Sequence, residues 1–233
     1  MRYRAVIFDL GGVVLPSPFD AFRAYERRHG LPHRFVSDVI VAGGESGAWS
    51  RHERGELDAE AFAVAFGAEC EAAGARVEVA DLFAGMRGGV PGDAPGALPE
   101  MVAAIQAIRA AGLRTAALTN NWADADGATH VSGESPLARQ LAGLFDTIVE
   151  SAREGLRKPD PRIYELTCAR LGVGPGASVF LDDIGANLKP ARAMGMATIK
   201  VEDPNVAVAE LEGLLGFPLG TTMRLPNETP GHD

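Results

Sequence analysis

Residues 5–12 read AVIFDLGG, and this stretch decides the fold. Its first four residues form a continuous apolar run, as expected for a buried parallel strand. Asp9 stands where that strand should end, and Gly11 and Gly12 follow, which lets backbone amides turn toward a bound anion. Taken alone, Asp9 is interpreted equally well as a nucleophile or metal ligand and as an Asx turn that ends the strand.

Four further apolar runs have the same character, and helical patterns separate them. They are TAAL at 115–118, TIV at 147–149, SVFL at 178–181 and ATIKV at 197–201. The helical stripes include Met101, Ile105 and Ile108 ahead of Gly112, and Val208, Leu211 and Leu215 near the carboxyl terminus. This alternation predicts an α/β fold, a doubly wound parallel sheet with helices on both faces.

Residues 19–87 interrupt the alternation, because they carry helical patterns and no convincing strand. Asp58 can cap a helix on which Phe62, Phe66 and Cys70 recur every four residues. The glycine- and proline-rich residues 88–96 resemble a hinge that returns to the sheet. We therefore expect a helical cap at 19–87, a Rossmann-like core at 1–18 and 88–220, and a flexible tail at 221–233.

Composition limits the class of protein. The 233 residues are 46% hydrophobic and 23% charged, and the net charge of -9 argues against nucleic acid or anionic membranes as partners. Cys70 and Cys168 form no CxxC pair, and the first apolar run is too short for a signal peptide or a membrane span, so we expect a cytoplasmic protein.

The last predicted helix lies near the end of the chain, so we expect no attached second enzyme. No oligomeric state is predicted.

Polar clusters follow the predicted strands. After Asp9 these are Thr119-Asn120, Lys158 and Asp182-Asp183. Because the loops at the carboxyl ends of parallel strands emerge on one side, we expect these groups to meet in one pocket. Turn chemistry explains Thr119 and Asn120 when each is taken alone, and a lone lysine is usually solvated, but adjacent aspartates need a cation or a shared proton. Together the groups form a complete set for phosphoryl transfer.

Four motifs in this order resemble the signature of the haloacid dehalogenase superfamily, in its branch with a helical cap. They are FDLGGVV at 8–14, LTNNW at 118–122, RKPDPRIY at 157–164 and VFLDDIGANLKPARAMGM at 179–196. From about residue 4 to about residue 219 the chain is similar to the N-terminal phosphatase domain of soluble epoxide hydrolases. GGVVLPSP at 11–18 resembles the equivalent domain fused to certain acyl-CoA dehydrogenases.

The resemblance implies a magnesium-dependent phosphatase of small phosphorylated molecules. Asp9 would be the nucleophile, and Lys158 would bridge it to the phosphoryl group. Thr119 and Asn120 would bind the phosphate beside the glycine cradle of Gly11 and Gly12. The implied Mg²⁺ ligands are Asp9, the Gly11 carbonyl and Asp183, with Asp182 beside them.

Gly11 departs from the family pattern. Phosphatases of the superfamily usually carry a second aspartate there, which protonates the leaving oxygen and later activates water. General acid-base help contributes about 10² to 10⁴-fold in rate. Two alternatives therefore stay open: a dehalogenase that uses Asp9 on carbon, and a phosphometabolite-binding protein that has lost turnover. By the resemblance, Asp182-Asp183 favours metal-dependent phosphate chemistry over carbon-halogen cleavage.

Residues 47–57, GAWSRHERGEL, are a candidate specificity element in the cap, through Trp49, Arg51, His52 and Arg54. The interpretation we favour is a solvated helix face with Trp49 packed inward. No catalytic role is assigned to His52. Trp122 either flanks the pocket or is a packing residue.

Overall fold

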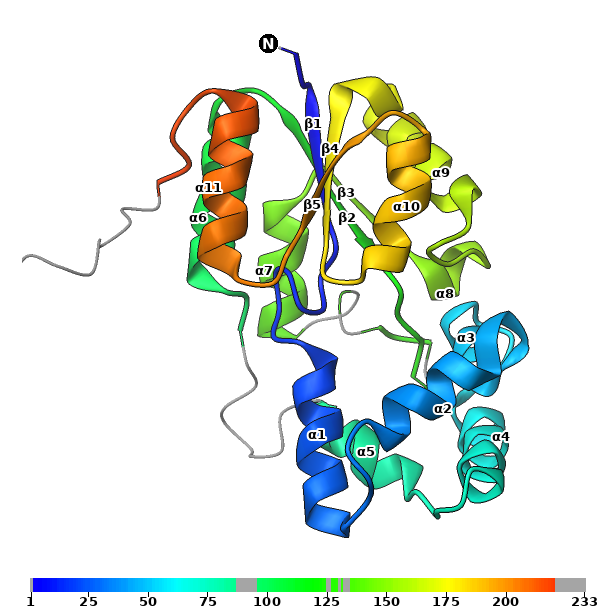
Figure 1. Ribbon diagram of the computed structural model, residues 1–233. Coiled ribbons are helices and arrows are strands. Elements are labelled where there is room, and N and C mark those ends of the chain that lie inside the picture. Colours follow the sequence, from blue (N-terminus) through cyan, green and yellow to red (C-terminus); the bar gives the residue numbers. More distant parts are fainter. Residues whose placement is uncertain (1, 87–95, 125–126, 130, 132–134, 221–233) are drawn as a thin grey trace, which may run out of the picture.

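Five short strands form one parallel sheet (Figure 1). They are β1 (Ala5–Phe8), β2 (Arg114–Thr119), β3 (Thr147–Glu150), β4 (Ser178–Asp182) and β5 (Ala197–Lys200). The computed structural model describes residues 2–86, 96–124, 127–129, 131 and 135–220. The strand order β3-β2-β1-β4-β5 reverses direction at β1, so the predicted doubly wound sheet is confirmed. All five apolar runs of the sequence coincide with these strands, except that Val201 lies one residue beyond β5.

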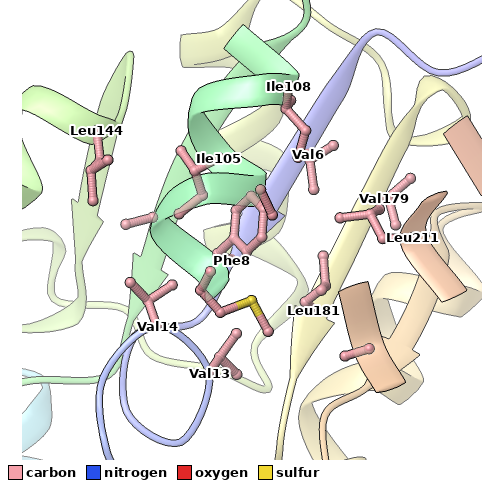
Figure 2. Close-up of a cluster of buried hydrophobic side chains, with 14 of the residues drawn as sticks. Val6, Phe8, Val13, Val14, Ile105, Ile108, Leu144, Val179, Leu181 and Leu211 are labelled. Carbon is pink, nitrogen blue, oxygen red and sulfur yellow. The ribbon is translucent and has the colours of Figure 1, made fainter. Parts of the chain in front are cut away.

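Alternate residues of β1 face opposite sides of the sheet. Val6 and Phe8 pack with side chains from α6 (Pro99–Ala110), α7 (Pro136–Leu144) and α11 (Pro204–Leu215), as Figure 2 shows. Ala5 and Ile7 pack with side chains from α9 (Pro161–Leu171) and α10 (Gly185–Ala193). Because both faces are covered, β1 is buried along its whole length, which explains its continuous apolar sequence.

Residues 18–86 form a helical insertion between β1 and α6. It contains α1 (Pro18–His29), α2 (Phe35–Gly43), the 3-10 turn η1 (Gly44–Ser46), α3 (Ala48–Glu53), α4 (Ala59–Ala72) and α5 (Val79–Met86). Every one of these residues is described, and none lies in a strand. The Asp58 side chain accepts a hydrogen bond from the Ala61 amide at the start of α4, which confirms that Asp58 is the N-cap residue of this helix.

The helical insertion has a hydrophobic cluster of its own, separate from the two beside the sheet. Phe62, Phe66 and Cys70 lie in it, as their spacing predicts. The insertion lies beyond the carboxyl ends of the strands (Figure 1). The predicted hinge falls almost entirely on residues 87–95, and the predicted tail on 221–233, and both ranges lie outside the described residues.

Two short elements complete the connections, α8 (Ser151–Glu154) after β3 and the 3-10 turn η2 (Pro175–Ala177) before β4. Within the described residues, no helix has the length and apolar character needed to span a bilayer.

Candidate active site

Asp9 directly follows β1 and is buried. Its backbone amide donates to the Leu181 carbonyl at 2.9 Å, which continues the pairing of β1 with β4. Its Oδ1 atom accepts a hydrogen bond from the Leu10 amide at 2.7 Å. This turn holds the carboxylate at the point where the strand order reverses, which is the usual ligand position in an open parallel sheet.

The loop after Asp9 requires glycine at one position. Gly12 has a φ of 79°, and a Cβ atom there would lie 2.3 Å from Oδ2 of Asp183. A side chain at Gly12 would therefore have to displace an acidic residue from the loop after β4. Gly11 does not have a positive φ, and among the described residues its Cβ would meet only Pro18, at 3.3 Å.

Lys158 is fully buried between two aspartates. Its Nζ atom lies 2.8 Å from Oδ1 of Asp9 and 2.7 Å from Oδ2 of Asp182. Its backbone is held from both sides by one side chain, because its amide donates to Asn120 Oδ1 at 2.8 Å and its carbonyl accepts from Asn120 Nδ2 at 3.0 Å. Solvated surface, the usual interpretation of a lone lysine, is therefore wrong here.

Asp182 ends β4 and is fully buried. Its Oδ1 atom accepts from the Ile184 amide at 2.8 Å, and the Asn187 side-chain amide lies 3.0 and 3.1 Å from its two oxygens. Asn187 is oriented in turn by Tyr164, whose hydroxyl donates to the Asn187 carbonyl at 2.7 Å. With Lys158 on Oδ2, both Asp182 oxygens are engaged by protein donors.

Burial and mutual repulsion perturb the carboxyl groups. Burial raises the pKa of Asp9 to about 8, and although the Lys158 charge opposes this, that of Asp182 adds to it. Burial, followed by the Asp182 charge, raises the pKa of Asp183 to about 6. Burial lowers the pKa of Lys158, but Asp182 and Asp9 outweigh it and raise that pKa overall.

The acidic cluster suits a hard divalent cation. One oxygen from each of Asp9, Asp182 and Asp183 can be chosen so that all lie within 4.8 Å of one another. When the three carboxyl groups are ionised, they outnumber the one buried ammonium, and a cation offsets the excess negative charge. Carboxylate and carbonyl oxygens are the ligands that Mg²⁺ binds in proteins, so the donor set fits this ion.

A family model for haloacid dehalogenase-like hydrolases matches residues 3–195. The chain belongs to this family. Over 232 residues it is 44% identical to acyl-CoA dehydrogenase family member 10 of Mus musculus, covering 98% of this chain and 20% of that protein. Over 235 residues it is 36% identical to bifunctional epoxide hydrolase 2 of Sus scrofa, covering 97% of this chain and 41% of that protein. Both resemblances predicted from the motifs are confirmed.

The chain therefore spans less than half of the length of these two relatives. The fold is also that of a solved haloacid dehalogenase family enzyme from Bacteroides thetaiotaomicron, in complex with magnesium and inorganic phosphate. That likeness has a TM-score of 0.55 at 16% identity and covers 86% of this chain and 96% of the other.

The described structure brings most of the predicted haloacid dehalogenase site residues together. Asp9, Asn120, Lys158 and Asp182 are linked by the contacts above, and Asp183 adjoins the Gly12 loop. Thr119 is the buried last residue of β2, directly before Asn120. Two supporting residues were missed, Tyr164 and Asn187. Both lie inside the family motifs, but a tyrosine and an asparagine on helices give no local signal that they support a carboxylate.

The favoured interpretation of the candidate specificity element, a solvated helix face, is wrong for most of α3, because all of its residues except Arg51 are buried. Trp49 packs inward as expected, but His52 is buried rather than solvated: it stacks on Phe62 with ring centroids 4.3 Å apart, and its Nδ1 bonds to the Leu57 carbonyl at 2.8 Å. Burial lowers the pKa of His52 accordingly. Arg51 and Arg54 form ion pairs with glutamates.

Trp122, the last residue of the second family motif, packs on the aromatic side chains of the insertion. Its ring centroid lies 4.8 Å from that of Phe83, 5.9 Å from that of Trp49 and 6.0 Å from that of His52. The packing interpretation of Trp122 therefore holds, and this residue joins the sheet domain to the insertion.

Proposed function

We propose that this chain is a magnesium-dependent phosphatase that hydrolyses small phosphomonoesters through an aspartyl-phosphate on Asp9. The observation that carries the proposal is the buried Lys158 ammonium, which lies within 2.8 Å of both Asp9 and Asp182. A carboxylate can attack an anionic phosphoryl group only where nearby positive charge offsets their repulsion.

The contacts of Asp9 assign different tasks to its two oxygens. Oδ1 is held by the Leu10 amide and by Lys158, so we assign Oδ2 as the oxygen that attacks phosphorus. The bond between phosphorus and the ester oxygen breaks as the new bond forms, and the leaving oxygen takes a proton from water, because Gly11 has no acidic side chain. Water then attacks the phosphorus of the aspartyl-phosphate, which releases inorganic phosphate and restores the carboxylate.

Asp9, the Gly11 carbonyl and Asp183 would hold Mg²⁺, which would supply positive charge to the carboxylate and the phosphoryl group. Asp182 has a different part in this proposal. Because both of its oxygens already accept hydrogen bonds from Lys158, Ile184 or Asn187, we assign it to orienting the lysine. This division refines the expectation that both adjacent aspartates face the cation.

Thr119 and the Gly11-Gly12 turn are the proposed contacts for the substrate phosphate, together with Asn120. The Asn120 side chain is engaged by the Lys158 backbone on both sides. We therefore propose that Asn120 contributes its backbone amide, and not its side chain, to phosphate binding. The insertion, at 18–86, would act as a cap over this site. The two cysteines are buried and free, which is consistent with a reducing cytoplasm.

The test is hydrolysis of p-nitrophenyl phosphate with and without Mg²⁺. We expect activity that chelation abolishes and that Asp9→Asn removes, while Asp38→Asn, an exposed aspartate in the insertion, serves as the control. A folded Asp9→Asn protein with the activity of the parent would contradict the proposal. Chloride release from 2-chloropropionate without metal would favour the dehalogenase alternative, and phosphate binding without turnover would favour the binding protein.

A further inference from the structure

Glu53 is the last residue of α3, and its carboxylate joins the helical insertion to the sheet domain. Within the insertion, Oε1 accepts a hydrogen bond from the Trp49 indole at 3.0 Å. Across the interface, Oε2 accepts from Arg157 Nε at 2.7 Å and lies 3.5 Å from Asn120 Nδ2. The Glu53 side chain is only 9% exposed and that of Arg157 16%, so the pair is shielded from solvent.

The two sheet-domain partners of Glu53 are the residues that place Lys158. Arg157 directly precedes the lysine in the chain, and Asn120 bonds to both the amide and the carbonyl of Lys158. A carboxylate of the insertion is therefore one contact away from the backbone that carries the buried ammonium.

The packing around Gly55 shows that the contact between Glu53 and Arg157 requires the insertion to lie directly against the sheet domain. Gly55, two residues after Glu53, has a φ of 71°, and a Cβ atom there would lie 2.6 Å from the Ala152 carbonyl of α8. Any side chain at Gly55 would therefore separate the two parts. Glu45 also contacts Arg157, at 2.7 Å, but its side chain is 68% exposed.

We propose that Glu53 is a positioning residue: through Arg157 and Asn120 it fixes the Lys158 backbone when the insertion is seated on the sheet domain. Lys158 is then held in place for catalysis only in the seated arrangement. The kinetic consequence rests on the proposed phosphatase function, whereas the structural link does not.

Charge and burial distinguish Glu53 from Glu45. In Glu53→Gln the Arg157 guanidinium keeps only Glu45, an exposed partner whose attraction water weakens, so the shielded contact is lost. Removing an exposed partner has little effect, because water replaces it. Glu45→Gln is therefore a matched control for Glu53→Gln, since both change a carboxylate that lies 2.7 Å from the same guanidinium.

The first measurement is hydrogen exchange of the Lys158 amide in the full chain, by NMR with uniform ¹⁵N labelling. In Glu53→Gln we expect this amide to exchange about tenfold faster or more, since local opening is favoured while the rest of the fold stays intact. The amide of Ile7, inside β1, reports global unfolding and should be unchanged. Glu45→Gln should behave as the parent at both amides.

The second measurement uses p-nitrophenyl phosphate with Mg²⁺. We expect Glu53→Gln to lower kcat about tenfold with little change in KM, because the charge that acts in the transition state is misplaced. Arg157→Gln should have a similar effect, and the double variant should be no worse than either single variant, because all three break one link.

The outcomes separate the two proposals. Faster Lys158 exchange in Glu53→Gln supports the link, even if neither the parent nor any variant hydrolyses phosphate, in which case the proposed function alone fails. Unchanged Lys158 exchange in a folded Glu53→Gln protein overturns the link, whatever the kinetics show. If Glu53→Gln does not fold, Arg157→Lys replaces it, because this variant keeps the charge but loses the forked guanidinium. Faster exchange of the Lys158 amide in Arg157→Lys then supports the link, and unchanged exchange overturns it.

Discussion

Lys158 Nζ lies 2.8 Å from Oδ1 of Asp9, and both side chains are buried. The second carboxylate on this ammonium belongs to Asp182, at 2.7 Å. A single positive charge thus compensates two of the three buried or half-buried carboxylates at the ends of β1 and β4. The stability of this region should therefore depend on the lysine and on a bound cation, independently of turnover.

Replacing Lys158 with methionine should destabilise the fold. The variant leaves Asp9 and Asp182 buried without their internal cation, so we expect the free energy of unfolding to fall by about 3–5 kcal/mol. Lys200→Met is the control, because Lys200 pairs with Glu202 at the surface and such pairs contribute about 1 kcal/mol or less. Urea unfolding in the presence of a chelator measures both. Equal losses in the two variants would contradict the assigned role of Lys158.

Magnesium should stabilise the protein more at alkaline than at acidic pH. Burial raises the pKa of Asp9 to about 8 and that of Asp183 to about 6, from the usual 3.8. Between the usual and the raised pKa of each group, the folded state holds more protons than the unfolded state. Without a cation, stability therefore decreases as the pH rises from about 4 to about 6 for Asp183 and to about 8 for Asp9. Bound Mg²⁺ offsets this loss, because it favours the ionised carboxylates.

The expected result is a larger Mg²⁺-induced increase in melting temperature at about pH 8 than at about pH 5. Scanning fluorimetry with and without chelator measures it. Asp183→Asn should reduce the increase at the higher pH, whereas Asp38→Asn should leave it intact. A shift of the same size at both values would show that these carboxyls do not bind the ion.

Restoring an acid at Gly11 should change substrate preference. The backbone at Gly11 is outside the left-handed region, and the nearest atom to an added Cβ is Pro18 Cδ at 3.3 Å, so aspartate fits after a small shift. A carboxyl there can protonate an alkoxide, so Gly11→Asp should raise alkyl over aryl phosphate hydrolysis by up to ~10²-fold. Repulsion from Asp9 and Asp183 opposes part of the gain.

The matched control is Gly12→Ala. It strains a φ of 79° and places Cβ 2.3 Å from Asp183 Oδ2, so we expect lower stability and a smaller effect of Mg²⁺. An unchanged alkyl-to-aryl ratio in a folded, magnesium-binding Gly11→Asp protein would show that the missing acid is supplied elsewhere, or that the chemistry is different.

Both thiols should be inert in the folded protein. Burial raises the pKa of Cys70 to about 12, and it also raises that of Cys168. Because the thiolate is the reactive species, Ellman's reagent should label neither residue until the chain is unfolded in guanidinium chloride, and then both. Rapid labelling of the native protein would mean that one of the two helices that carry them opens readily.

The sequence by itself determined the sheet, the helical insertion and the family. Parallel strands covered on both faces must be continuously apolar, so runs such as residues 5–8 could be recognised without any partner. Helix caps such as Asp58 are equally local, because their hydrogen bonds reach only a few residues along the chain. The site residues followed because the carboxyl ends of parallel strands meet on one side.

Only the tertiary structure decided which of these polar groups are buried and what each one holds. Lys158 is buried between aspartates at the carboxyl ends of two different strands, and His52 is buried where Phe62 stacks on it. Neither environment leaves a periodic signal in the sequence. The contact of Glu53 with Arg157 joins residues 104 apart, so it depends on how the insertion is seated on the sheet domain. Charge pairing at that distance is set by packing, which local sequence patterns do not encode.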